Sequence, residues 1–524
     1  MVIKVRELND VKSLEDMLNF VEKLRIESSN NRNNDEILSL VDRAIQKCEL
    51  IDDQKSLVKL YEIKISQIQH SEENFTVVTG LIRKMKAISQ KINYVGGLAL
   101  AYNVEWYIEK YKGNKQRSKS AIEKSMKFIA LNNNIEEYDY YTCYYSFGVE
   151  KWLLDHDEKA SCILEECVYY FMNNGFYRSL TFALGVLLII YQQNQNKEKM
   201  IDLTKKILGR RGFLEGIPEE IKSNIHFFIG FSQELSFNLN IAEEHLKKTA
   251  SILKPIYKSS IYSSYYITAL PYLVATFALQ GKLELAYNKM IEIDELIQEG
   301  IATRNLDEFN KEQMKHIFNL TKFYILSRLQ GFQSEHLQEL KQNILANISK
   351  CYSNAIFFSE FLLNTELTKE QLIELQNLKN PSTLRVEHII NFLIEKTSNP
   401  DEKYLIEAIS KLKNRPVEER MTTVEKAFAD LLAAQEYYKL GRFSEIYPLL
   451  KKYENKLNGI EVLELRIFME AFVQVGAFKN GDPLGPALQY MAIKKCQNYG
   501  FSRLENRLLN YLDLQSQEVR NFIH

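Results

Sequence analysis

The chain has 524 residues, of which 45% are hydrophobic and 26% are charged. This length exceeds what one hydrophobic core usually supports, so several domains or an elongated repeat array are expected, and the apolar share argues against disorder. The formal net charge of −1 lacks the basic excess of a typical nucleic-acid-binding protein, so no direct nucleic-acid partner is expected.

The first ninety residues predict four amphipathic helices, because apolar residues recur there at three- and four-residue spacing. The expected helices are 11–27, 34–48, 53–69 and 75–90, with a polar loop of serine, asparagine and arginine between the first two. Two interpretations remain open for this region. It forms either an N-terminal helical bundle that caps the rest of the chain or two degenerate helix pairs.

From residue 94 onward the apolar pattern predicts helices in pairs, separated by short polar breaks. The expected pairs are 94–111 with 116–131, 136–154 with 158–173, 177–193 with 197–209, 218–236 with 239–253, 262–280 with 283–299, 311–330 with 335–349, 382–396 with 401–414, and 422–440 with 443–456, followed by a last group over 460–514. Repetition of such a pair predicts an all-α fold, an α-solenoid of antiparallel helix pairs.

The uncharged segment 259–281 lies within this array and is long enough to span a membrane. Serine, threonine and tyrosine dilute its apolar character, and a helix-turn signature closes it. We therefore expect a buried helix of a soluble protein and no membrane partner.

The most regular pair carries a recognisable pattern of large and small residues. Leu273, Phe277, Gly281, Leu283, Ala286 and Met290 follow the tetratricopeptide (TPR) order, with glycine at the turn and alanine where the two helices approach closely. Ala434, Tyr437, Gly441, Phe443 and Leu450 repeat it in part. In this second match Ile446 stands where alanine is expected, and Pro448 should kink or shorten the second helix.

The repeat is longer than the ordinary TPR period of about 34 residues. Positions 121, 160, 200, 242 and 286 occupy the same slot at intervals of 39, 40, 42 and 44 residues, giving a period of about 40. The chain thus resembles the long-repeat TPR-like ligand-binding domains of bacterial peptide-sensing regulators of the Rap and PlcR type and of MalT-type activators. The resemblance covers about 94–300 and 422–456. It implies a TPR-like superhelix, but no helix-turn-helix DNA-binding domain is recognisable.

We divide the chain into three regions. Residues 1–90 form the N-terminal bundle or degenerate repeats, 91–375 the TPR-like superhelix, and 376–524 further TPR-like helical repeats. The last boundary lies where the pattern weakens around Asn380-Pro381 and Asn399-Pro400. Six scattered cysteines without a CxxC pair and an N-terminus without a signal peptide predict a cytoplasmic protein.

No motif in the sequence indicates catalysis, a metal or a cofactor. Phosphate-binding glycine loops, HExxH, GxSxG and zinc-ligand spacings are absent. His156, flanked by acidic residues, is more consistent with a solvated turn than with a metal site. We therefore expect no cofactor, no metal and no enzymatic activity.

The aromatic residues suggest a binding surface. They are densest from Tyr138 to Trp152, where core packing and a ligand groove both remain open interpretations. In the TPR family the first helix of each pair lines the inner face. Counting back from each turn predicts a binding site formed by Asn103, Tyr107, Tyr145, Asn224 and Phe231. For each of these residues, packing in the core between repeats remains the alternative interpretation.

The expected function is a non-catalytic, regulatory module that captures a peptide or a protein segment in a superhelical groove. The alternative is a scaffold or adaptor subunit that holds a larger assembly through its outer surface. A protein or peptide partner is expected in either case, and the sequence leaves open whether the chain forms a homodimer.

Overall fold

A computed structural model describes the protein over most of its length. The residues described are 5–31, 35–68, 72–132, 134–155, 159–193, 197–210, 215, 217–256, 263–303, 308–329, 335–347, 367–377, 387–399, 401–414, 422–481 and 485–511. His156 and Cys351 lie outside these ranges.

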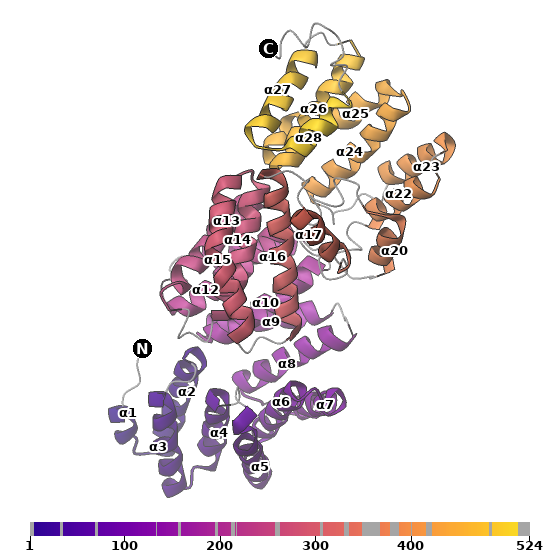
Figure 1. The fold of residues 1–524 in the computed structure, drawn as a ribbon. Coiled ribbons are helices and arrows are strands. Elements are labelled where there is room, and N and C mark those ends of the chain that lie inside the picture. Colours follow the sequence, from indigo (N-terminus) through magenta and orange to yellow (C-terminus); the bar gives the residue numbers. More distant parts are fainter. Residues whose placement is uncertain are drawn as a thin grey trace. The chain divides into compact units, whose positions relative to one another are not determined.

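Within this part of the chain there are 25 α-helices and no strand, which confirms the predicted all-α fold (Figure 1). The helices are α1 Val5–Asn9, α2 Leu14–Asn30, α3 Asp35–Ile51, α4 Gln54–Ile68, α5 Phe75–Lys91, α6 Val95–Tyr111, α7 Lys115–Ala130, α8 Glu137–Asp155, α9 Lys159–Asn173, α10 Tyr177–Gln193, α11 Lys197–Gly209, α12 Glu219–Leu235, α13 Leu239–Leu253, α14 Ser263–Leu279, α15 Leu283–Thr303, α16 Glu308–Leu329, α17 Glu335–Leu345, α20 Lys369–Asn377, α22 Glu387–Ser398, α23 Glu402–Lys413, α24 Thr423–Lys439, α25 Ile446–Leu450, α26 Leu463–Lys479, α27 Gly485–Asn498 and α28 Ser502–Leu509. Short 3₁₀ helices flank α5 and α25, at Glu72–Asn74, Phe443–Glu445 and Lys451–Gly459.

Successive helices pack against one another from α1 to α9, from α13 to α17 and from α20 to α28, as a solenoid of helix pairs requires. The first helices of five successive pairs begin at Val95, Glu137, Tyr177, Glu219 and Ser263, in steps of 42, 40, 42 and 44 residues. This spacing agrees with the repeat of about 40 residues predicted from the small residues of the second helices. The α1 and α20 helices were not expected, and both are short.

The contacts divide the chain into two compact units, Met1–Ile190 with Gly212–Ile221, and Tyr191–Arg211 with Lys222–His524. In the first unit α2 packs against α4, α4 against α6, and α6 against α8, while α3, α5 and α7 lie between them in sequence (Figure 1). The helices of residues 1–90 thus alternate in the same way as those that follow. The three regions predicted from the sequence stay predictions.

In the second unit, the helix α14 covers most of the uncharged segment. Every residue from Ala269 to Leu279 is buried. No helix in the described part of the chain is long and apolar enough to cross a membrane. The expectation of a buried helix is therefore confirmed over Ala269–Leu279.

The two glycines of the TPR-like pattern have the same backbone conformation. Gly281 and Gly441 have positive φ angles of 80° and 69°, the left-handed region in which glycine is favoured. They differ in surroundings, because a Cβ atom on Gly281 would overlap the side chain of Leu463, whereas the space beside Gly441 is open.

The second TPR-like match departs from the pattern where the sequence predicted it would. The helix that contains Pro448 is only five residues long and continues as a 3₁₀ helix, as expected for proline inside a helix. The bulk of Ile446 is accommodated by the next helix. A Cβ atom on Gly476 of α26 would lie 2.9 Å from Ile446 Cγ2, so glycine replaces the missing alanine on the opposite side of the contact.

Candidate functional site

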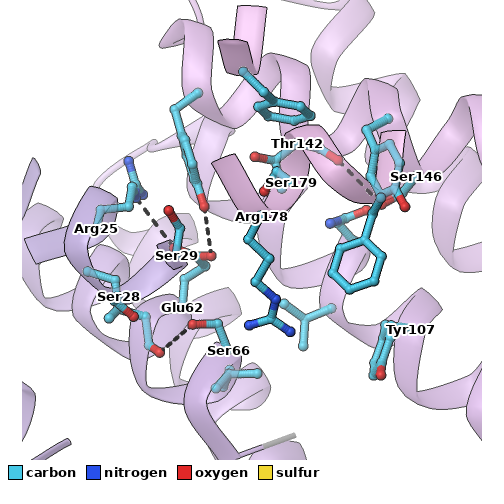
Figure 2. Close-up of a pocket in the computed structure, with 18 of the residues that line it drawn as sticks. Arg25, Ser28, Ser29, Glu62, Ser66, Tyr107, Thr142, Ser146, Arg178 and Ser179 are labelled. Carbon is cyan, nitrogen blue, oxygen red and sulfur yellow. Dashed lines mark hydrogen bonds and ion pairs between the residues drawn. The ribbon is translucent and has the colours of Figure 1, made fainter. Parts of the chain in front are cut away.

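The first unit contains a pocket of about 490 Å³ (Figure 2). Apart from Phe171 of α9, its lining residues come from α2, α4, α6, α8 and α10. These are alternate helices of the array, so the pocket lies along the face formed by one helix from each pair. Its volume falls in the range of small-molecule and cofactor sites, about 300–1,000 Å³.

Helical spacing places the lining residues on one face of each helix. On α6 they include Asn103, Tyr107 and Lys110, at i, i+4 and i+7, and on α8 they include Thr142 and Tyr145. Residues at these spacings lie on one side of an α-helix. The repeated face brings together hydroxyls from five helices, namely those of Ser28, Ser29, Ser66, Tyr107, Tyr138, Thr142, Tyr145, Ser146 and Ser179.

The five residues predicted to bind a partner fall into two groups. Asn103, Tyr107 and Tyr145 all line this pocket. Asn224 and Phe231 lie on α12 within the second unit. The structure therefore brings three of the five together, and the binding role of all five stays a prediction.

Asn224 and Phe231 have different environments. Asn224 is 1% exposed, and neither atom of its amide has a hydrogen-bond partner among the described residues. Phe231 packs edge to face against Tyr272, with ring centroids 4.9 Å apart, and stacks on Phe227. Phe231 is half-buried, and its ring contacts show that it takes part in aromatic packing within the second unit.

The aromatic residues of α8 divide between these two environments. Tyr138 and Tyr145 line the pocket. Tyr141 instead stacks on Tyr170 of α9, with centroids 4.2 Å apart, and Tyr140 contacts both Tyr141 and Tyr144. The dense cluster in the sequence is thus partly pocket lining and partly packing between α8 and α9.

One side of the pocket is formed by a buried charge network centred on Arg25. This side chain is 1% exposed, and its three nitrogens lie 3.3–3.5 Å from Glu22, Glu62 and Asp139. Its guanidinium carbon also lies 4.1 Å from the centroid of Tyr138, whose hydroxyl donates a hydrogen bond to Glu62. Arg25 is therefore surrounded by acceptors and negative charge within the protein.

The pKa shifts in this network follow from burial and from the partners. Burial disfavours the charged form of Arg25, but Asp139, Glu62 and Glu22 raise its pKa well above the ordinary value. Burial raises the pKa of Glu62, and Arg25 opposes that shift. Burial likewise raises the pKa of Asp139, against the effects of Arg25 and of the Tyr94 hydroxyl that donates to it. The network therefore strongly favours the charged form of Arg25, whereas burial makes the charged forms of Glu62 and Asp139 less favourable than they are in water.

A second arginine in the pocket has a different environment. Arg178 is 5% exposed, and its Nε and Nη2 atoms have no hydrogen-bond partner among the described residues. Figure 2 shows its guanidinium extending into the pocket, between Ser66 and Tyr107 in that view and away from Arg25. Two further lining groups lack partners within the described chain, Asn103 Oδ1 and Trp106 Nε1.

No protein-family model matches this chain, and no curated protein is significantly similar to it in sequence. The described residues contain no cluster of three or more histidine, cysteine or acidic side chains arranged to hold a metal. The pocket instead presents hydroxyls, amides and guanidinium groups, which form hydrogen bonds and ion pairs with a bound molecule.

Sequence reasoning missed Arg25, Glu62, Trp106 and Arg178. A signal was available for Arg178, because it is the one charged residue in the otherwise apolar and polar helix Tyr177–Gln193. A charge inside a helix that is buried on most sides requires a partner or a function. No comparable signal marks Arg25 or Glu62, since charged residues are common on the helices that contain them.

Proposed function

We propose that this chain is a non-catalytic binding protein that holds a peptide or a protein segment in the pocket lined by α2, α4, α6, α8 and α10. One observation carries the proposal. The lining of this pocket includes Asn103, Trp106 and Arg178, each of which has buried polar atoms without a hydrogen-bond partner in the described chain. Buried polar groups are normally hydrogen-bonded, so a set of unpartnered ones in one pocket favours a bound molecule that satisfies them.

A peptide fits these groups for a chemical reason. Each residue of an extended chain presents one N–H donor and one C=O acceptor. The amide of Asn103 can donate and accept, and so can the hydroxyls of the serine, threonine and tyrosine residues around it. Tyr107 and Tyr145, both partly exposed, add aromatic contact area of the kind that contributes strongly to binding.

The resemblance to TPR-like ligand-binding domains supports the same proposal. The pocket is lined by alternate helices, which is the face that such domains use for their ligands. We accordingly propose a regulatory role like that of the Rap, PlcR and MalT-type repeat domains, with a peptide or protein partner and no direct contact with nucleic acid. Five described cysteines are free thiols, four of them buried, and this supports the proposed cytoplasmic location.

The proposal predicts a distinct effect for Asn103. Replacing it with alanine should weaken peptide binding by about 1–3 kcal/mol, because a ligand group would lose its hydrogen-bond partner. The free energy of unfolding should change little, since Oδ1 has no partner to lose within the described chain. Binding is measured by calorimetry with a peptide selected from a random library displayed against the purified protein.

Asn224→Ala is the matched comparison, because it removes another buried asparagine with an unpartnered amide. If both variants weaken peptide binding equally, the binding surface includes α12, as the sequence-based hypothesis predicts. An effect of Asn103→Ala alone would confine it to the pocket. If no peptide can be selected, or if Asn103→Ala binds as tightly as the unmodified protein, the proposed function is wrong.

The scaffold alternative makes a different prediction. A partner held by the outer surface should bind a Tyr107→Ala variant as well as it binds the unmodified protein, because Tyr107 lines the pocket. Parallel pull-downs with the two proteins distinguish these possibilities. Sedimentation measurements on the same samples show whether the chain forms a homodimer.

A further inference from the structure

Two buried arginines line the pocket, and only one of them is neutralised within the described chain. Arg25 lies among Glu22, Glu62 and Asp139, at distances of 3.3–3.5 Å. Arg178 is buried to a similar extent, yet its Nε and Nη2 atoms have no partner there. The protein therefore provides internal compensation for one guanidinium charge and leaves the other facing the pocket.

Neither deprotonation nor a neighbouring group compensates the charge of Arg178 within the described chain. Arginine keeps its proton in proteins, so it cannot escape burial by becoming neutral. The centroid of the Phe182 ring lies 5.5 Å from the guanidinium carbon, which gives a modest cation–π attraction. An unpaired buried charge is destabilising, so its presence at this position favours a role in binding an anion.

The other charges of the lining are already engaged. Four lining residues carry charge, namely the cations Arg25, Lys110 and Arg178 and the carboxylate Glu62. Glu62 is paired with Arg25 at 3.4 Å, and Lys110 lies 3.4 Å from Glu150. The pocket thus has an excess of positive charge, and Arg178 is where that excess lies.

We propose that the pocket binds its ligand through a carboxylate placed against the guanidinium of Arg178. This inference rests on the proposed function and adds the chemical class of the group that is recognised. The planar N–H fork of arginine matches the two oxygens of a carboxylate. The indole N–H of Trp106 is a further unpartnered donor in the same lining.

A carboxylate fits this pocket better than a phosphate. One unpaired cation matches one negative charge, whereas a phosphate dianion would bring a second charge into a lining that includes Ile63, Val104 and Phe182. Burying that second charge without a partner is costly. In a peptide the carboxylate is either the C-terminus or the side chain of an aspartate or glutamate.

Trp106 provides a local reporter for the test. The chain has two tryptophans, and Trp106 lines the pocket. In a Trp152→Phe background its fluorescence reports on the pocket alone. The probes are pools of random pentapeptides with free C-terminal carboxylates, the same pools with amidated C-termini, amidated pools lacking aspartate and glutamate, and inorganic phosphate.

We expect the free-carboxylate pool to bind. We expect the amidated pool that lacks aspartate and glutamate not to bind. If the amidated pool that retains aspartate and glutamate binds equally well, the recognised carboxylate belongs to a side chain. If that pool does not bind, the recognised carboxylate is the C-terminus. Both results support recognition of a carboxylate.

Substitution of Arg178 provides the second arm. Arg178→Met should reduce affinity for the free-carboxylate pool at least tenfold. Arg178→Lys keeps the charge but loses the N–H fork, so its affinity should lie between those of Arg178→Met and the unmodified protein. Neither variant should unfold at a lower urea concentration, because no internal ion pair of Nε or Nη2 is lost. Arg117→Met is the matched control, since Arg117 is an arginine of the same unit with a 79% exposed side chain.

The outcomes separate this inference from the proposed function. If the amidated pool without acidic residues binds as well as the others and Arg178→Met binds normally, carboxylate recognition is refuted while peptide binding stands. If phosphate alone changes Trp106 fluorescence, or if no pool binds, both are refuted. The inference would also be refuted if Arg178→Met destabilised the protein but still discriminated between the pools as the unmodified protein does. Arg178 would then stabilise the fold and would not bind the ligand.

Discussion

Acidification should destabilise the second unit through a pair of buried histidines. His226 on α12 and His245 on α13 are 5% and 3% exposed, and their Nδ1 atoms lie 2.8 Å apart. At this distance one ring donates its Nδ1 hydrogen and the other accepts. The arrangement suits two neutral rings or one charged ring, but two charged rings would bring two N–H donors together.

The pKa values of the pair follow from this geometry. Burial lowers the pKa of His226 to about 4, with further lowering by His245 and Lys248 and an opposing effect of Glu244. Burial also lowers the pKa of His245 to about 4, with the same effects of Lys248 and Glu244. Both folded pKa values thus lie below 6.5, the ordinary value of a histidine side chain.

The sign follows from linkage. A histidine with a lowered pKa in the folded state binds fewer protons there than in the unfolded state between pH 4 and 6.5. Its stabilising contribution is present above pH 6.5 and is lost as the pH falls toward 4. Between these limits the loss is about 1.4 kcal/mol per pH unit for each histidine, so going from pH 7 to pH 5 removes about 2 kcal/mol per ring and up to about 4 kcal/mol for the pair.

The assay compares the unmodified protein with a His226→Asn/His245→Asn double variant at pH 7, 6 and 5. Asparagine side chains can hydrogen-bond to each other without titrating in this range. Hydrogen exchange of the α13 amides reports the local opening free energy, and urea unfolding reports the global one. The chain's other histidines are common to both proteins, so the difference isolates the pair. Equal losses of stability in the two proteins between pH 7 and pH 5 would refute the reasoning.

Two further predictions concern packing in the second unit. Gly441→Ala should cost about 1–2 kcal/mol for the left-handed backbone alone, and Gly281→Ala should cost about 1–3 kcal/mol more, because its methyl group also meets Leu463. Urea unfolding measures both variants, and equal costs would contradict the overlap. Arg328→Met should cost about 3–5 kcal/mol, since Arg328 pairs with Glu464 at 2.6 Å with both side chains 2% exposed. Adding Glu464→Leu should recover much of that loss of stability, because it removes the carboxylate that is left unpaired. If the double variant is no more stable than Arg328→Met, the buried charge is not the cause of the loss.

The helices could be read from the sequence because local forces determine them. The expected pair 177–193 with 197–209 has the bounds of α10 and α11, and the neighbouring pairs differ from the expectation by a few residues. Apolar periodicity requires only that each helix bury one face, and glycine or asparagine at the breaks ends the helices. The short helices α1 and α20 escaped prediction because five and nine residues carry too little periodic signal.

The candidate site could be predicted only in part. Asn103, Tyr107 and Tyr145 were placed on the inner face by counting from the turns, since that face depends on helical spacing alone. Their association with Arg25, Glu62 and Arg178 depends on how five helices between α2 and α10 pack, and those residues are more than 150 positions apart at the extremes.

The sequence by itself determined that this chain forms an array of helix pairs with a period of about 40 residues, and which faces of the helices are apolar. The tertiary structure alone decided which charges are compensated. Arg25 is surrounded by carboxylates from α2, α4 and α8, and Arg178 faces a pocket. The sequence marks Arg178 only as the one charged residue of its helix, and it does not show whether either arginine has a partner, because the energy of a buried charge depends on partners brought from other helices.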